Sequence, residues 1–106
     1  MNPMRSETIY FGTNKPGGTV SEEEWRRFLA EAVTPRFPDG LSVWQASGQW
    51  RGKSGVIERE HSQVLSLIHV DSPKDEKGLS EVISAYKSKF NQEAVLRVSN
   101  TVCTSL

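Results

Sequence analysis

Disulfides and long apolar segments are missing from this sequence. It contains one cysteine, Cys103, which cannot form an internal disulfide and is expected to be a bystander thiol, with an intermolecular disulfide or a reactive thiol as the alternatives. No apolar run approaches the ~18 residues that a membrane-spanning helix requires. The N-terminal residues also lack the apolar core of a signal peptide. The sequence therefore predicts a cytoplasmic protein, with a mature exported form as the alternative.

An excess of charge of one sign is absent as well. Thirteen basic residues balance thirteen acidic ones, whereas binding through nucleic-acid phosphates needs a positive surplus on one face. The glycine-containing segment 14–18 matches no phosphate-binding loop. The two histidines have no cysteines or carboxylates at metal-ligand spacing. We therefore expect no nucleic-acid partner, no membrane partner, no metal and no cofactor.

The chain does contain an ordered series of strand and helix patterns. Its 106 residues, 36% hydrophobic and 25% charged, are typical of one soluble globular domain. Residues 1–6 are predicted to be an irregular lead-in. A capping box at Ser21 and Glu24 begins the first helix, and Pro35 ends it. The other predicted elements are a strand at 8–12, a strand hairpin at 41–50 and 56–70, a helix from Pro73 and a strand at 94–102.

The resulting βαββαβ order is typical of α+β proteins with a ferredoxin-like two-layer sandwich. We predict a single ferredoxin-like domain over residues 7–104. Its antiparallel sheet is expected to have strand order 4-1-3-2, with both helices on one face. The helical periodicity predicts a core in which the two helices meet through Trp25, Phe28, Leu29, Val82, Ile83 and Tyr86.

Strand alternation assigns the sheet residues to two faces. The face toward the helices is predicted to hold Ile9, Phe11, Leu41, Val43, Leu65, Leu67, Leu96 and Val98. The open face is predicted to hold Tyr10, Trp44, Ala46, Glu60, Ser62, Val64, Ser66, Ile68 and Arg97. This open face is too apolar for bulk water and too polar for a core. We therefore expect a homodimer that covers it, as in a dimeric α+β barrel, with a ligand pocket or a solvated face as the alternatives.

Five residues of the predicted open face form the candidate ligand-binding site: Tyr10, Trp44, Glu60, Ser62 and Arg97. Glu60 would be a general base or a polar anchor, Arg97 would pair with an anion, and the two aromatic rings would form stacking walls. This pattern predicts a small-molecule-binding protein or a cofactorless enzyme, with its pocket on the open sheet face. The alternative is a non-catalytic protein-interaction module that binds through an exposed face or edge. The residues leave open whether the protein is an enzyme.

Several short motifs resemble those of a known family. They are Phe11-Gly12, Pro-Arg-Phe-Pro-Asp-Gly at 35–40, Gly-Gln-Trp at 48–50, Arg-Glu-His-Ser at 59–62, and Tyr86, Phe90 and Gln92. Together they resemble an uncharacterised bacterial domain family of unknown function, over about residues 8–98. The resemblance implies no activity. It does direct attention to Glu60, Ser62 and Gln92, because the needs of the fold explain polar positions less readily than apolar ones.

Overall fold

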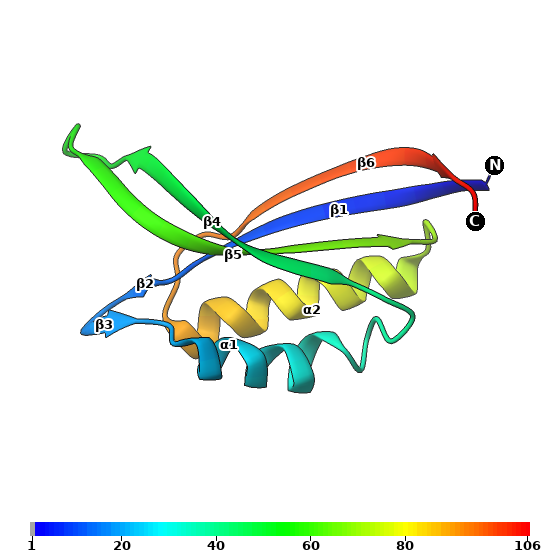
Figure 1. Cartoon of the computed structure of the whole chain (residues 1–106), viewed down its shortest axis with the longest axis horizontal. Coiled ribbons are helices and arrows are strands. Elements are labelled where there is room, and N and C mark those ends of the chain that lie inside the picture. The colour runs from blue at the N-terminus through cyan, green and yellow to red at the C-terminus, as the bar shows by residue number, and fades with distance from the viewer. Residues whose placement is uncertain (1) are drawn as a thin grey trace.

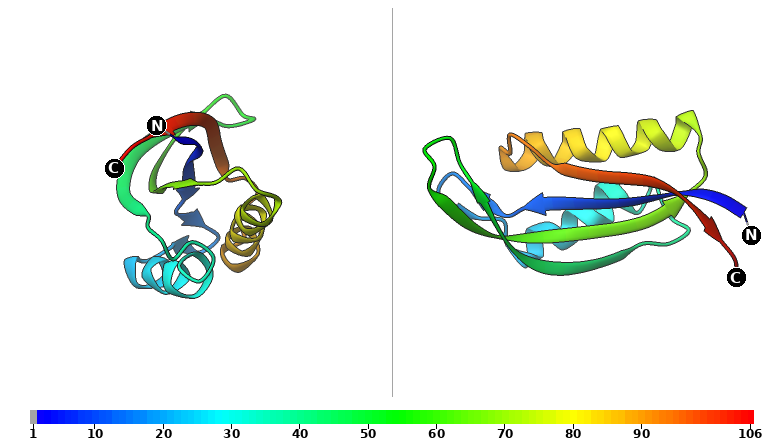
Figure 2. Two further views of the ribbon diagram at one scale, coloured as in Figure 1. Left: turned by 90° about the vertical axis from the view of Figure 1, so that its right-hand side faces the viewer. Right: turned by 90° about the horizontal axis from the view of Figure 1, so that it is seen from above.

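The computed structural model describes residues 2–106 as a two-layer α+β sandwich (Figure 1). Strands β1 (Asn2–Gly12), β4 (Ser42–Arg51), β5 (Ile57–His69) and β6 (Leu96–Thr104) form an antiparallel sheet in the order β4-β5-β1-β6. Helices α1 (Glu22–Phe28) and α2 (Pro73–Phe90) both cover the same face of this sheet (Figure 2). The predicted ferredoxin-like architecture, strand order and helix placement are therefore confirmed.

The first strand is longer than its sequence predicts. Residues 2–6 were expected to be irregular, yet they pair with β6 from Asn2 opposite Thr104 to Ser6 opposite Asn100. That expectation is wrong for residues 2–6, because pairing with a neighbouring strand overrides the weak strand propensity of Asn, Pro and Ser. Met1 lies outside the described residues. The loop after β1 also differs, since β2 (Asn14–Lys15) and β3 (Gly18–Thr19) form a short ribbon whose turn contains Gly17 at φ 82°.

Helix α1 begins at the side-chain cap that the sequence predicts, and helix α2 begins at the predicted Pro73. The Ser21 hydroxyl accepts a hydrogen bond from the Glu24 amide at 3.0 Å, and the Glu24 carboxylate accepts one from the Ser21 amide at 2.9 Å. After Phe28 the chain continues as a π-helical turn, Leu29–Val33, before Pro35 ends the helix. Helix α2 begins after the cap residue Ser72 and ends at Asn91, which adopts a left-handed backbone conformation.

The core lies between the sheet and the two helices. Phe11 and Tyr86 meet with ring centroids 4.6 Å apart, and Phe28 lies 5.2 Å from Tyr86. The predicted core residues are confirmed: Trp25, Phe28, Val82 and Tyr86 are buried, and Leu29 and Ile83 pack against them partly buried.

The face assignment of β6 is the main error of the sequence-based prediction. Ile9 pairs with Arg97, so Arg97 lies on the helix-facing side of the sheet. Leu96 and Val98, predicted to face the helices, are instead 60% and 48% exposed on the open face. Val43 does share the face of Leu65 but is 41% exposed, because β4 is an edge strand.

Candidate functional site

Four of the five predicted site residues lie on the open face: Tyr10, Trp44, Glu60 and Ser62. The strand register places Trp44 and Tyr10 on either side of Val64. Trp44 is 49% and Tyr10 is 37% exposed, whereas Val64 between them is fully buried. The two rings therefore shield the aliphatic side chain and leave their own outer surfaces available for contact.

The carboxylate of Glu60 is held above the backbone of Gly12. A Cβ atom at position 12 would lie 2.8 Å from Glu60 Oε2 and 2.9 Å from Oε1. The Asn14 amide donates to Glu60 Oε2 at 2.8 Å, and from the helix side the Tyr86 hydroxyl donates to the Gly12 carbonyl at 2.6 Å. Because residue 12 is glycine, the Glu60 carboxylate has room to lie over its backbone. Gly12 itself pairs with Ser62 of β5.

Residues Gly12, Thr13 and Asn14, called here the β1 exit, are tied to β5 and α2 where β1 leaves the sheet. The Thr13 amide and hydroxyl both donate to the His61 carbonyl, at 3.1 and 2.6 Å. The Gln92 side-chain amide donates to the Asn14 carbonyl at 2.5 Å. Glu60 and Gln92, which belong to separate sequence motifs, therefore both contact the β1 exit at Asn14.

Two open depressions adjoin the β1 exit. The larger, of about 550 Å³, is lined by Asn14, Ser47, Gly48, Gln49, Arg59, Glu60 and His61. The smaller, of about 320 Å³, is lined by Thr13, Thr19, Val20, Ser21, Glu22, Gln45, His61, Ser62 and Gln63. The larger depression reaches from the open-face residue Glu60 to Arg59 and His61, which alternate to the other face of β5. The sequence predicts a pocket on the open face alone.

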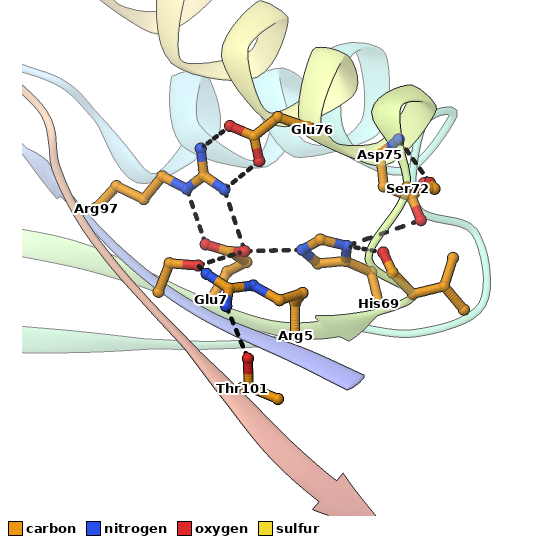
Figure 3. A network of polar contacts seen from close by, with 10 residues as sticks. Arg5, Glu7, His69, Ser72, Asp75, Glu76, Arg97 and Thr101 are labelled. Atoms are coloured by element: carbon orange, nitrogen blue, oxygen red, sulfur yellow. Dashed lines mark hydrogen bonds and ion pairs between the residues drawn. The ribbon is translucent and has the colours of Figure 1, made fainter. Parts of the chain in front are cut away.

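Arg97, the fifth predicted site residue, belongs to a separate polar network under helix α2 (Figure 3). Its guanidinium donates to Glu7 at 2.8 and 3.1 Å and to Glu76 at 2.8 and 2.7 Å. These paired contacts hold β6 against β1 and α2. Arg97 therefore cannot pair with an anion bound beside Glu60, because the register of β6 places its side chain on the helix-facing side of the sheet.

Glu7 is the centre of this network and is completely buried. Besides Arg97, it accepts hydrogen bonds from His69 Nε2 at 2.8 Å and from the Ser99 hydroxyl at 2.9 Å. Burial raises the pKa of Glu7, but the hydrogen bonds from Arg97, His69 and Ser99 together outweigh it and lower the pKa to about 2. Hydrogen bonding to Glu76 and Glu7 in turn raises the pKa of Arg97.

His69 joins the network to the start of α2. Its Nε2 faces the Glu7 carboxylate, and its Nδ1 lies 2.6 Å from the Val70 carbonyl and 3.7 Å from Asp75. The Glu7 carboxylate can only accept, so His69 Nε2 donates to it, and Nδ1 faces two further acceptor groups. In residues 2–106 no buried side-chain nitrogen or oxygen lacks a partner. This completeness is typical of a structural network rather than of a site awaiting a ligand.

Sequence reasoning missed this network, although one signal was present. Glu7 alternates with Ile9 and Phe11, both predicted to face the helices, so the same parity places a carboxylate on the buried face. A buried carboxylate requires partners, and Arg97 and His69 supply them.

Other classes of site have little support from the side chains. Within residues 2–106, no group of three or more His, Cys, Asp or Glu residues could hold a metal ion. That same part of the chain has no helix with the length and apolar character to cross a membrane.

The strand order and the placement of both helices on one face define a small α+β sandwich of the ferredoxin-like type. The chain belongs to the DUF3574 family, described as proteins of unknown function, and its sequence matches that family over residues 6–106. The resemblance to a family without an assigned activity is thereby confirmed. No curated protein matches the sequence.

Solved structures share this fold. A phage SAM lyase in complex with S-methyl-5'-thioadenosine superposes with a TM-score of 0.71 at 22% identity, covering 92% of this chain and 80% of that chain. CutA from Synechococcus elongatus superposes with a TM-score of 0.61 at 16% identity, covering 96% of this chain and 79% of that chain. At these identities the similarity establishes the fold and carries no activity.

Proposed function

We propose that the protein is a homodimeric small-molecule-binding protein whose ligand contacts Glu60 beside the β1 exit. The observation that carries this proposal is the state of the carboxylate. Glu60 Oε2 accepts a hydrogen bond from the Asn14 amide, whereas Oε1 has no hydrogen bond to any residue from 2 to 106. The group is thus held in place by one oxygen, with the other available on the wall of the larger depression.

The neighbouring side chains indicate what kind of ligand would fit. A carboxylate favours a positively charged group or a hydrogen-bond donor. Arg59 and His61 line the same depression and form no ion pair within residues 2–106, so they replace Arg97 as the groups for an anionic part of the ligand. Tyr10, two residues before Gly12 on the same face, offers an aromatic surface. A zwitterionic molecule would match Glu60 together with Arg59 and His61, and a flat ring attached to it would have to extend from the depression over the open face to reach Tyr10.

This chemistry suggests the first compounds to test. One fold neighbour, the phage SAM lyase, was solved with S-methyl-5'-thioadenosine. SAM carries positive charge and a carboxylate on a molecule with a flat base, so SAM and S-methyl-5'-thioadenosine are suitable probes. In a cofactorless enzyme Glu60 would act as a base toward the bound molecule. In a binding protein it would only anchor the ligand.

Chemical-shift perturbation by NMR tests the proposal. Addition of SAM should shift the amides of residues 12–14 and 59–61, and Glu60→Gln should weaken binding at least tenfold. Glu58→Gln is the matched control, because residue 58 lies on the same face two positions away and outside the depression. Absence of shifts in these segments with either probe would contradict a ligand of this class. Shifts confined to other segments would move the site elsewhere.

A non-catalytic interaction module is the second candidate function. It is favoured by the exposed apolar residues of the open face: Tyr10, Trp44, Trp50, Ile68, Leu96 and Val98. A protein face of this kind is usually covered by another protein surface.

Sedimentation at micromolar concentration should show a homodimer, and a monomer that nevertheless binds SAM would remove the dimer from the proposal. A bacterial source and a cytoplasmic location remain expectations from the sequence.

A further inference from the structure

Strand β4 is an edge strand without the usual protection against pairing. It is the outermost strand of the sheet, and Arg51 is the only charged residue between Ser42 and Arg51. It contains no proline, and its backbone forms no hydrogen bond to any other described element besides β5. Natural edge strands usually carry lysines, prolines or bulges that prevent association. Strand β4 has neither lysine nor proline, and its pairing with β5 keeps one register without a bulge, so its outer edge is open to a further strand.

The sequence of β4 is close to a palindrome centred on Ser47. In both directions from this residue the chain reads small residue, glutamine, tryptophan: Ala46, Gln45 and Trp44 on one side, and Gly48, Gln49 and Trp50 on the other. In antiparallel pairing the two residue numbers of each opposite pair have a constant sum. Two copies of β4 centred on Ser47 would therefore pair like with like along seven residues.

We infer that β4 pairs antiparallel with β4 of a second copy, in the register that places Ser47 opposite the partner's Ser47. Trp44 then lies opposite the partner's Trp50, and Gln45 lies opposite the partner's Gln49. A twofold axis at Ser47 makes each contact twice, as a symmetric dimer interface requires. The result is a continuous eight-stranded sheet with all four helices on one side.

The neighbouring registers lack this complementarity. A shift of one position on each strand would place Trp44 opposite the partner's Gly48, or Trp50 opposite the partner's Ala46. Such a shift would separate both tryptophan pairs and both glutamine pairs. In the Ser47-centred register the tryptophans meet on the open face, where Trp44 and Trp50 are 49% and 54% exposed in the single chain. Cross-strand aromatic pairs are among the stabilising contacts of antiparallel sheets.

Charge and edge length also favour a second copy as the occupant. The chain has no net charge, so two copies do not repel each other. No charged side chain lies between Trp44 and Trp50, and Arg51 falls opposite the partner's Val43 at the end of the pairing. The ten residues of β4 exceed the usual strand length of five to six, which provides a long edge for association.

This pairing also changes the larger depression at the β1 exit. Three of its lining residues, Ser47, Gly48 and Gln49, belong to the paired part of β4. The depressions of the two copies would then adjoin at the twofold axis, and the partner's β4 would close one side of each. This last step rests on the proposed function, whereas the strand pairing itself does not require a ligand.

Cysteine cross-linking tests the register directly. In a Cys103→Ser background, Ser47→Cys should form a disulfide-linked dimer on mild oxidation. Opposite Cα atoms in antiparallel strands are about 4.5–5.5 Å apart, within the range of a disulfide. Gln45→Cys and Gln49→Cys should not cross-link alone. In this register each residue lies four positions along the strand, about 13 Å, from the same residue of the second copy. A mixture of these two variants should cross-link.

A charge substitution provides an independent measurement. Ser47→Lys places two like charges opposite each other at the axis and should convert the dimer to a folded monomer, checked by sedimentation and by circular dichroism. A dimer that persists in Ser47→Lys, or that forms no Ser47→Cys cross-link, overturns the β4 pairing and leaves a homodimer through another surface. A monomeric wild-type protein in sedimentation would overturn both the β4 pairing and the homodimer itself. Equal cross-linking by all three single variants would show random collision and also overturn the register.

Discussion

Glu7 and Arg97 share two hydrogen bonds across β1 and β6, at 2.8 and 3.1 Å, with Glu7 completely buried. Removing the arginine leaves a buried carboxylate with part of its charge unbalanced. Arg97→Met should therefore lower the free energy of unfolding by about 3–5 kcal/mol in urea titrations. Arg27→Gln is the control, because it breaks an ion pair with Glu23 that is largely exposed and should cost less than ~1 kcal/mol. Equal small losses would show that the pair is not needed for stability.

The same carboxylate predicts how stability depends on pH. The pKa of Glu7 falls from 4.5 to about 2 on folding, so the folded state holds its proton less tightly than the unfolded state. Its contribution is fully present above pH 4.5 and is lost as the pH falls toward 2. The difference amounts to roughly 3 kcal/mol. Urea unfolding between pH 6 and pH 2 should show this loss, and Glu7→Gln should flatten it. An unchanged slope in Glu7→Gln would assign acid sensitivity to other groups.

Phe28 lies at the centre of the aromatic core. It is 2% exposed and contacts Trp25, Tyr86 and Phe90 with ring centroids 5.2–6.2 Å apart. Phe28→Ala should reduce the free energy of unfolding by about 3–5 kcal/mol, because it leaves a cavity among these rings. Val56→Ala, at a side chain in the exposed hairpin turn, should cost less than ~0.5 kcal/mol. Denaturant melts that show a loss below ~1 kcal/mol for Phe28→Ala would place it outside the core.

Gly12→Ala tests the position of Glu60 without disturbing the core. The added methyl group would meet the end of a flexible side chain rather than backbone, so the free energy of unfolding should change by only about 1 kcal/mol. The carboxylate should move away and release the Asn14 amide, which NMR hydrogen exchange would detect as faster exchange. The proposed binding of SAM should weaken with it. Thr8→Ala, on the same face of β1 and away from Glu60, should leave Asn14 protected.

The order of elements could be predicted because each depends on a local pattern. The capping box at Ser21 and the alternation of Ile9 and Phe11 with polar residues require no knowledge of the partner segments. The face of β6 could not be assigned in this way. Leu96 and Val98 alternate with Arg97 and Ser99, and the open face is itself apolar, so hydrophobicity is compatible with both orientations. Pairing of Arg97 with the buried Glu7 decides between them.

The candidate site was predictable to a similar degree. Strand alternation alone places Glu60 on the face of Tyr10 and Trp44. The contacts of Glu60 with Gly12 and Asn14 depend on the path that the chain takes beside β5 as it leaves β1, which is a tertiary arrangement. No sequence pattern within β1 or β5 predicts these contacts, apart from Gly12, whose lack of a side chain leaves room for the Glu60 carboxylate.

The two chain ends lie side by side, since Asn2 pairs with Thr104, and both are at the end of the molecule opposite the β4–β5 hairpin (Figure 1). In a molecule 45 Å long, this arrangement keeps an attached group far from the hairpin end of β4 and from the β1 exit. An affinity tag, a fluorophore or a surface linker at either end would lie away from the proposed β4 pairing and the proposed ligand site. A short peptide could also join the two ends, with new ends opened in the hairpin turn at 52–55, to give a circular permutant in which β4 and β5 are no longer joined by that turn.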